Sequence, residues 1–234
     1  MMKQTVMFDL DGTLLPMDQT QFTEGYFALL GQYAAGFGYD PKILIPALWK
    51  ATLAMVNNDG TMSNEERFWK VFHDLTGCGG KKDRDCLLRF YETGFTDARA
   101  FCGRSEEAIR LVQSLYESGT DLILATNPLF PRSATLARIG WAGLRPEMFR
   151  IITTYETMNT CKPNPAYFTE LLGKAGVSAE NCRMIGNDAV EDIAAEYAGI
   201  EVFLIPDCLE HPEELRPDMR KGSFRDAEAW LLDH

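Results

Sequence analysis

An apolar run near the N-terminus ends in two acidic residues. Residues 6–8 are all apolar, Asp9 and Asp11 follow within three positions, and Gly12 comes directly after them. A run of this kind is typical of a buried strand in a parallel sheet. Ligands of open α/β sheets bind beyond the carboxyl ends of the strands. Two carboxylates at such an end therefore indicate a site rather than core packing.

Four more short apolar runs follow, and each has the length of a buried strand. They cover residues 121–126, 149–153, 183–186 and 201–205. Between them lie segments with helical spacing of apolar residues, such as Ile109, Val112 and Leu115. Strands that alternate with helices in this way are typical of βαβ units. We therefore predict an α/β fold built on a Rossmann-like parallel sheet.

Residues 17–100 break this alternation. They contain no convincing strand pattern, and four stretches in them show apolar residues at helical spacing. Turn residues separate these stretches, for example at 57–60 and 77–80. We predict an inserted all-helical domain over 17–100, with the α/β core domain formed by 1–16 and 101–234.

Chemically versatile residues follow four of the predicted strands. In chain order they are Asp9 and Asp11, then Thr126 and Asn127, then Lys162, then Asp188 and Asp192. The carboxyl ends of parallel strands lie along one edge of a sheet, so these distant residues are expected to converge.

Each of these pieces, taken alone, has an ordinary structural explanation. Asp11 before a glycine is typical of a turn. Thr126 and Asp188 are good helix-capping residues. Lys162 before a proline suits a solvated loop, and Glu191 suits a solvated helix face. Only their conjunction lacks such an explanation.

The four aspartates of this set create an electrostatic problem. Two carboxylates about 4 Å apart repel by roughly 4 kcal/mol at an effective dielectric constant of about 20. Lys162 offsets one of the charges, and a divalent cation is the simplest remedy for the others. Oxygen ligands without histidine favour Mg²⁺ over zinc.

Taken together, these motifs resemble the four motifs of the haloacid dehalogenase superfamily, in the same order. The matching residues are Asp9-x-Asp11-Gly12-Thr13, then Thr126, then Lys162, then Gly186-Asn187-Asp188-x-x-x-Asp192. A helical insert between the first and second motifs resembles the C1-type cap of that superfamily. The last motif departs from the common Gly-Asp form through Asn187, so the acidic ligand is placed on Asp188, with Glu191 as an alternative.

The resemblance implies a role for each residue. Asp9 is expected to be the nucleophile that forms an aspartyl-phosphate, and Asp11 the general acid and base. The expected phosphate-binding residues are Thr126, Asn127 and Lys162. The expected Mg²⁺ ligands are Asp9, Asp11 (through its backbone carbonyl), Asp188 and Asp192.

Asp11 also separates activities within the superfamily. Members that cleave carbon–halogen or carbon–phosphorus bonds lack an acid at this position, so its presence favours a phosphatase. We predict a Mg²⁺-dependent enzyme that hydrolyses small phosphate monoesters. A phosphomutase of sugar phosphates remains an alternative because it uses the same groups, and so does a binding or regulatory protein without turnover.

The helical insert is expected to select the substrate. Asn58 and Asp59, in a polar turn, are candidates for reaching into the site. Gln19 and Tyr26 are others, and Arg67 could engage a second anionic group. The physiological substrate and the oligomeric state are not predicted.

The composition limits the classes of partner that the protein is expected to bind. A net charge of −11 argues against binding nucleic acid, but it is compatible with a small phosphorylated metabolite. No apolar stretch approaches the length of a membrane span, and no secretory signal is expected at the N-terminus. The six cysteines are scattered, without a Cys-x-x-Cys pair, which is typical of reduced thiols in the cytoplasm.

Overall fold

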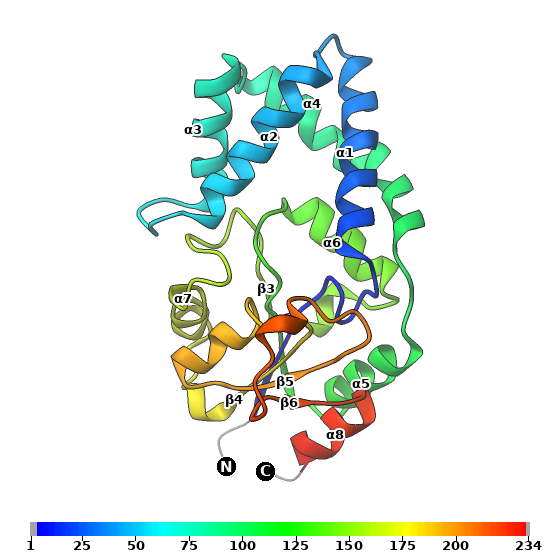
Figure 1. The fold of residues 1–234 in the computed structure, drawn as a ribbon, viewed down its shortest axis with the longest axis vertical. Coiled ribbons are helices and arrows are strands. Elements are labelled where there is room, and N and C mark those ends of the chain that lie inside the picture. The colour runs from blue at the N-terminus through cyan, green and yellow to red at the C-terminus, as the bar shows by residue number, and fades with distance from the viewer. Residues whose placement is uncertain (1–3, 233–234) are drawn as a thin grey trace.

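The computed structural model describes residues 4–232 and contains a six-stranded sheet (Figure 1). The strands are β1 (Thr5–Phe8), β2 (Asp121–Leu124), β3 (Ile151–Ile152), β4 (Cys182–Gly186), β5 (Glu201–Leu204) and β6 (Arg220–Lys221). Their order is β3-β2-β1-β4-β5-β6, and every pair is parallel. The prediction of a Rossmann-like parallel sheet is confirmed, with one strand more than the five predicted.

The extra strand is β6, which the sequence did not indicate. It has only two residues, and both Arg220 and Lys221 are exposed. An edge strand of this kind buries nothing, so it leaves no apolar run in the sequence.

Helices cover both faces of the sheet. They are α5 (Glu106–Glu117), α6 (Arg132–Trp141), α7 (Ala166–Ala175) and α8 (Phe224–Leu232). Alternate residues of β1 pack on opposite faces. Val6 and Phe8 belong to the apolar cluster that includes residues of α5 and α8, whereas Met7 packs in the cluster of α7. This double coverage explains why residues 6–8 of β1 are all apolar.

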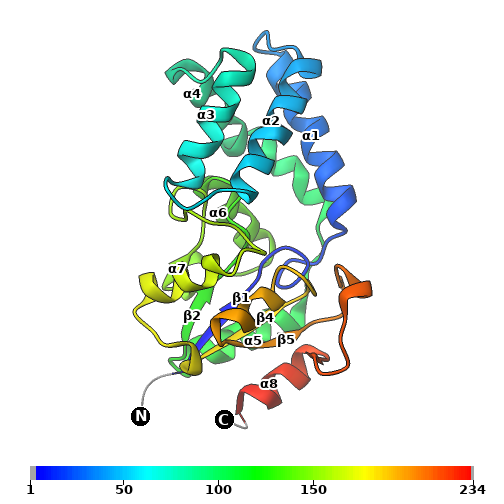
Figure 2. The ribbon, with the colours of Figure 1, turned by 60° about the vertical axis from the view of Figure 1, so that its left-hand side comes forward.

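The predicted helical insert forms four α-helices and a 3₁₀ helix. These are α1 (Gln19–Ala35), α2 (Pro41–Val56), α3 (Asn64–Thr76), α4 (Lys81–Glu92) and η1 (Gly94–Phe101). We call residues 19–101 the helical segment. Figures 1 and 2 show it at the opposite end of the molecule from α8. Sequence reasoning predicted the four α-helices but not η1.

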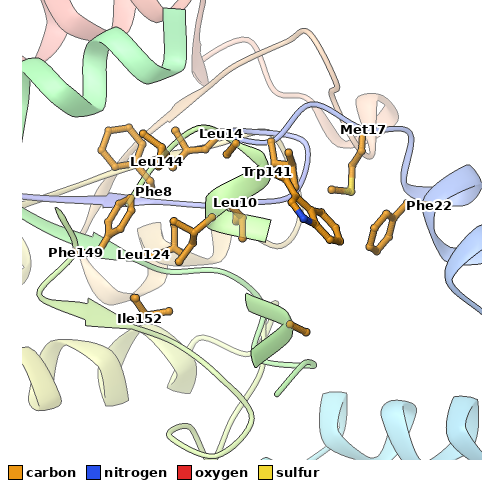
Figure 3. Packing of buried hydrophobic residues seen from close by; sticks show 14 of the residues in the cluster. Phe8, Leu10, Leu14, Met17, Phe22, Leu124, Trp141, Leu144, Phe149 and Ile152 are labelled. Atoms are coloured by element: carbon orange, nitrogen blue, oxygen red, sulfur yellow. The ribbon is translucent and has the colours of Figure 1, made fainter. Parts of the chain in front are cut away.

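Two neighbouring connections join the helical segment to the sheet. Met17 and Cys102 form an antiparallel bridge, and the Gly103 amide donates a hydrogen bond of 2.6 Å to the Pro16 carbonyl. Apolar packing continues across this junction, because Met17 and Phe22 belong to the same cluster as Phe8 (Figure 3). Within residues 4–232 no helix has both the length and the apolarity needed to cross a membrane.

Candidate active site

The carboxyl ends of β1, β2 and β4 meet around one pocket of about 180 Å³. In-register pairing brings these ends together, because Phe8 is aligned with Leu124 on one side and with Ile185 on the other. The predicted site residues in the pocket wall are Asp9, Asp11, Thr126, Asn127, Asp188 and Asp192. The structure therefore brings all the predicted core-motif residues to one place, with Lys162 directly beside them.

Lys162 is a fully buried cation at the centre of this arrangement. Its Nζ donates a hydrogen bond of 2.9 Å to Asp9 Oδ1 and one of 2.6 Å to Asp192 Oδ1. Burial alone would lower the pKa of Lys162, but the charges of Asp192 and Asp9 outweigh it and hold that pKa well above its ordinary value. Lys162 is therefore charged and links the first strand to the last motif.

Asp9 lies at the end of β1 and is almost completely buried. Burial raises the pKa of its carboxyl to about 7, helped by the charges of Asp192 and Asp11 and opposed by Lys162. Thr13 Oγ1 donates weakly to the other oxygen, at 3.4 Å. The site thus holds more negative charge around Asp9 than Lys162 neutralises.

Asp11 is paired with Arg138, a residue that sequence reasoning missed. Arg138 comes from α6, is fully buried, and forms an ion pair with Asp11 Oδ2. Its guanidinium also lies 4.2 Å from the ring centroid of Phe130. The signal in the sequence was an arginine on the apolar face of a helix, beside the buried Ala134 and Ile139. The other oxygen, Asp11 Oδ1, is buried without a hydrogen-bond partner.

Thr126 and Asn127 follow β2, as predicted. The Thr126 carbonyl accepts hydrogen bonds from Thr153 Oγ1 at 2.7 Å and from the Tyr167 hydroxyl at 3.0 Å, which fixes this turn. Asn127 Nδ2 donates to Glu191 Oε1 at 2.9 Å and to the Lys162 carbonyl at 3.3 Å. Both amide hydrogens of Asn127 are therefore engaged within the protein.

Asp192 has both carboxylate oxygens engaged. Oδ1 accepts from Lys162, and Oδ2 accepts from the backbone amides of Asn187 and Asp188, at 2.9 and 3.0 Å. A β-carbon at Gly186 would overlap with this carboxylate, which explains the glycine there. Asp192 thus shapes the loop after β4 and holds Lys162.

Asn187, where the last motif departs from the common pattern, has a structural role. Its Oδ1 accepts a hydrogen bond of 2.7 Å from Thr13 Oγ1, and its Nδ2 donates one of 2.6 Å to the Cys208 carbonyl. A side chain at Gly12, whose φ is +86°, would collide with it. Asn187 therefore joins the loops after β1 and β5.

Asp188 begins a tight turn rather than an α-helix. Its Oδ1 accepts from the amides of Val190 and Glu191, at 2.7 and 2.9 Å, and contacts His211 Nδ1 at 2.9 Å. A 3₁₀ helix, η4 (Ile193–Ala198), begins only afterwards. The interpretation of Asp188 as the cap of an α-helix was therefore wrong, because the loop is held by side-chain bonds to its own amides.

Glu191 was expected on a solvated helix face, and this was also wrong. It lines the pocket and is only partly exposed. Burial raises the pKa of its carboxyl to about 8, with Lys162 opposing and Asp188 and Asp192 adding to the rise. Its surroundings depend on residues distant in sequence, so its local pattern gave no sign of them.

The two substrate contacts predicted in the helical segment do not reach the pocket. Asn58 is buried, donates to Asn64 Oδ1 at 2.9 Å and accepts from Arg67. Asp59 accepts from Thr61 and from Arg67. These bonds use the polar atoms that suggested a ligand site. Gln19 of α1 does line the pocket.

The donor set of the pocket suits a hard cation. The available side-chain oxygens belong to carboxylates, amides and the Thr126 hydroxyl. The carboxyls of Asp9, Glu191 and Glu210 carry raised pKa values, and Asp11 Oδ1 and Asn127 Oδ1 are buried without partners. In the described part of the chain, no three His, Cys, Asp or Glu side chains are already gathered as a metal centre. Instead, the aspartates are paired with basic side chains, Asp9 and Asp192 with Lys162, Asp11 with Arg138, and Asp188 with His211.

Comparison with known proteins gives the family. The chain matches the model described as "Hydrolase: haloacid dehalogenase-like hydrolase" over residues 3–199, so it belongs to this family and is a hydrolase. Among curated proteins it is similar to a ribulose-1,5-bisphosphate 5-phosphatase from Halopiger xanaduensis, with 27% identity over 87% of this chain and 84% of the relative. It is also similar to phosphoglycolate phosphatase 1 from Pseudomonas aeruginosa, with 24% identity over 83% of this chain and 66% of the relative.

Solved structures show the same fold. A 2-haloacid dehalogenase from Pseudomonas syringae pv. tomato has a TM-score of 0.66 and 21% identity, and the match covers 99% of both chains. The putative hydrolase YfnB from Bacillus subtilis has a TM-score of 0.59 and 20% identity, again with 99% of both chains covered. At these identities the likeness concerns the fold alone.

Proposed function

We propose that this hydrolase is a Mg²⁺-dependent phosphatase of small phosphate monoesters that works through an aspartyl-phosphate on Asp9. The observation that carries the proposal is the contact of Asp9 with the buried Lys162, with Asp11 in the same pocket. The names of the two curated relatives support phosphate-ester hydrolysis. The residues support the individual steps.

Asp9 attacks phosphorus, so that one of its carboxylate oxygens bonds to phosphorus as the bond to the alcohol oxygen breaks. Asp11 protonates that leaving oxygen and later takes a proton from the water that cleaves the aspartyl-phosphate. Lys162 and Thr126 hold phosphate oxygens as charge shifts during transfer. The free oxygen of Asp11 is the natural carrier of this proton, because Arg138 holds the other one.

Asp9, the Asp11 carbonyl and Asp188 would hold Mg²⁺, with Glu191 as an additional carboxylate in the same wall. Asp192 was predicted as a ligand too, but both of its oxygens already accept hydrogen bonds, so we assign it the role of orienting Lys162 and the loop. The bound ion would let the anionic Asp9 approach an anionic phosphate.

We further propose that residues 17–100 act as the cap of this site and that the enzyme works in the cytoplasm. Gln19 reaches the pocket from the helical segment, which supports the first point. All six cysteines are free thiols, which supports the cytoplasmic location.

A phosphomutase is disfavoured, because no Lys or Arg among the described residues lines the pocket to bind a second phosphate.

The test is hydrolysis of 4-nitrophenyl phosphate and of a panel of alkyl phosphates with and without Mg²⁺. We expect turnover only with the metal, and we expect Asp9→Asn to lower kcat at least about a thousandfold. Asp207→Asn, an exposed aspartate outside the pocket wall, is the matched control and should keep full activity. Equal turnover by Asp9→Asn and the parent would refute the proposal, and absence of any turnover would favour the binding protein.

A further inference from the structure

A second pocket of about 260 Å³ opens directly beside the catalytic one. Gln19, Leu129 and Phe130 line both pockets, so the two are adjacent. The second pocket lies between α1, α2 and the turn after β2. A phosphate ester bound at Asp9 would place its alcohol portion next to this space.

The walls of the second pocket are apolar and aromatic. Phe22 and Tyr26 come from α1, Trp49 and Leu53 from α2, and Phe130 from the core. Trp49 and Leu53 are about half exposed, at 53% and 52%, although they are large and apolar. Exposed side chains of this kind beside a cavity are typical of a binding surface.

Charged groups are missing from this wall. None of the described residues that line the second pocket is Asp, Glu, Lys, Arg or His. The catalytic pocket has no lysine or arginine in its wall either, and Lys162 below it is occupied by Asp9 and Asp192. His211 is the remaining basic side chain of the catalytic wall, and its Nδ1 already contacts Asp188 Oδ1 at 2.9 Å. A second phosphate or a carboxylate on the substrate would therefore find no unpaired cation among the described residues of the two walls.

Hydrogen-bonding groups interrupt the apolar wall at a few places, namely Gln19, Thr23, Thr52 and a pair of tyrosines. The hydroxyl oxygens of Tyr26 and Tyr91 lie 2.7 Å apart. Two hydroxyls carry two hydrogens, and the bond between them uses one, so one O–H is left to donate. Burial raises the pKa of Tyr26 to about 12, so this group is a neutral donor at neutral pH.

We infer that the substrate is the phosphate monoester of an apolar, preferably aromatic, alcohol that carries no second anionic group. This inference rests on the proposed phosphatase function and specifies its leaving group. The space is sufficient, because a cavity of about 150 Å³ with apolar walls already holds benzene. The inference also separates this enzyme from its named relatives, whose substrates are a bisphosphate and phosphoglycolate.

The direct test compares 2-phenylethyl phosphate with ethyl phosphate and phosphoglycolate. The first two have aliphatic alcohols of similar reactivity as leaving groups, so they differ mainly in the apolar extension. We expect kcat/KM for the phenylethyl ester to exceed that for the ethyl ester at least about tenfold, and phosphoglycolate to be the poorest of the three. A phenylethyl ester no better than ethyl phosphate, or a preference for phosphoglycolate, would overturn the inference and leave the phosphatase function intact.

A substitution in the second pocket should remove this preference. Thr52→Lys places a charge in the apolar wall, and we expect the ratio of the two kcat/KM values to fall at least about fivefold. Ala54→Lys adds the same charge to the same helix outside the pocket and should leave the ratio unchanged. Because a ratio is measured, loss of folded protein cancels. An unchanged ratio in Thr52→Lys would contradict the inference.

A binding measurement separates this inference from catalysis. Trp49 is one of four tryptophans and lies in the wall of the second pocket. The product alcohol 2-phenylethanol should change the tryptophan fluorescence of the parent, glycolate should not, and Trp49→Phe should lose the change. No response in the parent, or an undiminished response in Trp49→Phe, would refute this pocket even if the enzyme hydrolyses phosphate esters.

Discussion

The α/β core and the helical segment differ in the kind of side chain that they bury: the core buries charged groups, and the described part of the helical segment does not. All the buried charged side chains found in the described chain belong to the core, namely Asp9, Arg138, Lys162 and Asp192. The helical segment instead buries aromatic rings, which pack edge to face around Phe95 and Phe90. Its buried polar side chains, Asn58 and Asn64, are neutral amides.

This difference fits a division of tasks, with the reaction in the α/β core and the selection of the substrate in the helical segment. Buried charges are costly unless they are paired, so their concentration at one sheet edge supports the proposal that catalysis takes place there. Aromatic packing provides shape and apolar surface without charge. The core therefore suits phosphate chemistry, and the helical segment suits recognition of an apolar group.

The strongest test of this comparison is removal of the central cation. Lys162→Met leaves Asp9 and Asp192 buried without their partner, and we expect a loss of about 3–5 kcal/mol in the free energy of unfolding, together with loss of turnover. Urea denaturation and kcat measure the two effects. Lys174→Met is the matched control, because Lys174 is exposed and forms only a helical ion pair of 3.4 Å with Glu170. It should change the stability by less than about 0.5 kcal/mol. Equal effects of the two substitutions would contradict a special role for buried charge.

The complementary test weakens the packing of the helical segment. Phe72 of α3 is fully buried and stacks near Phe68, outside both pockets. We expect Phe72→Leu to cost about 1–1.5 kcal/mol of stability and to change kcat for ethyl phosphate by less than about twofold. Urea denaturation and initial rates give both numbers. A large fall in kcat in fully folded protein would show that the two regions do not divide their tasks in this way.

The sequence predicted those parts of the site that follow from local pattern and sheet topology together. Apolar runs alternating with helical stretches require a parallel sheet, and a parallel sheet brings its carboxyl ends together, so Asp9, Asp11 and Asp188 could be expected in one pocket. Lys162 could be expected there as well, because it follows the third predicted strand. Its burial between two carboxylates needed the structure.

The residues that sequence reasoning misjudged depend on distant neighbours. Arg138 forms an ion pair with Asp11, which is 127 positions away in the sequence. Glu191 accepts a hydrogen bond from Asn127, which is 64 positions away. Asn58 and Asp59 were expected to be available for a substrate because they lie in a polar turn. In the structure they form hydrogen bonds with residues close to them in sequence, Asn58 with Asn64 and Asp59 with Thr61. Local patterns report the preferences of a residue, whereas these outcomes depend on which groups the fold places opposite it.

The smallest expected effect concerns a partly exposed carboxylate of the helical segment that is hydrogen-bonded to neutral groups. Asp83, in the first turn of α4, accepts a hydrogen bond from the Tyr39 hydroxyl at 2.5 Å and bonds from the Gly79 and Gly80 amides at 2.9 and 3.1 Å. The Tyr39 bond is the main reason why the pKa of Asp83 lies below its ordinary value. A carboxyl with a lowered pKa in the folded protein stabilises the fold above its unfolded pKa, and this stabilisation is lost as the pH falls through the folded pKa.

We therefore expect Asp83→Asn to reduce the free energy of unfolding by about 1 kcal/mol or less at pH 7, because the group is mostly solvated. The difference from the parent should shrink below about pH 4. Urea denaturation of both proteins at pH 7 and pH 3.5 measures it, with Tyr39→Phe as the variant that removes only the principal donor. A difference that stays constant between the two pH values would mean that Asp83 acts through packing and not through its charge.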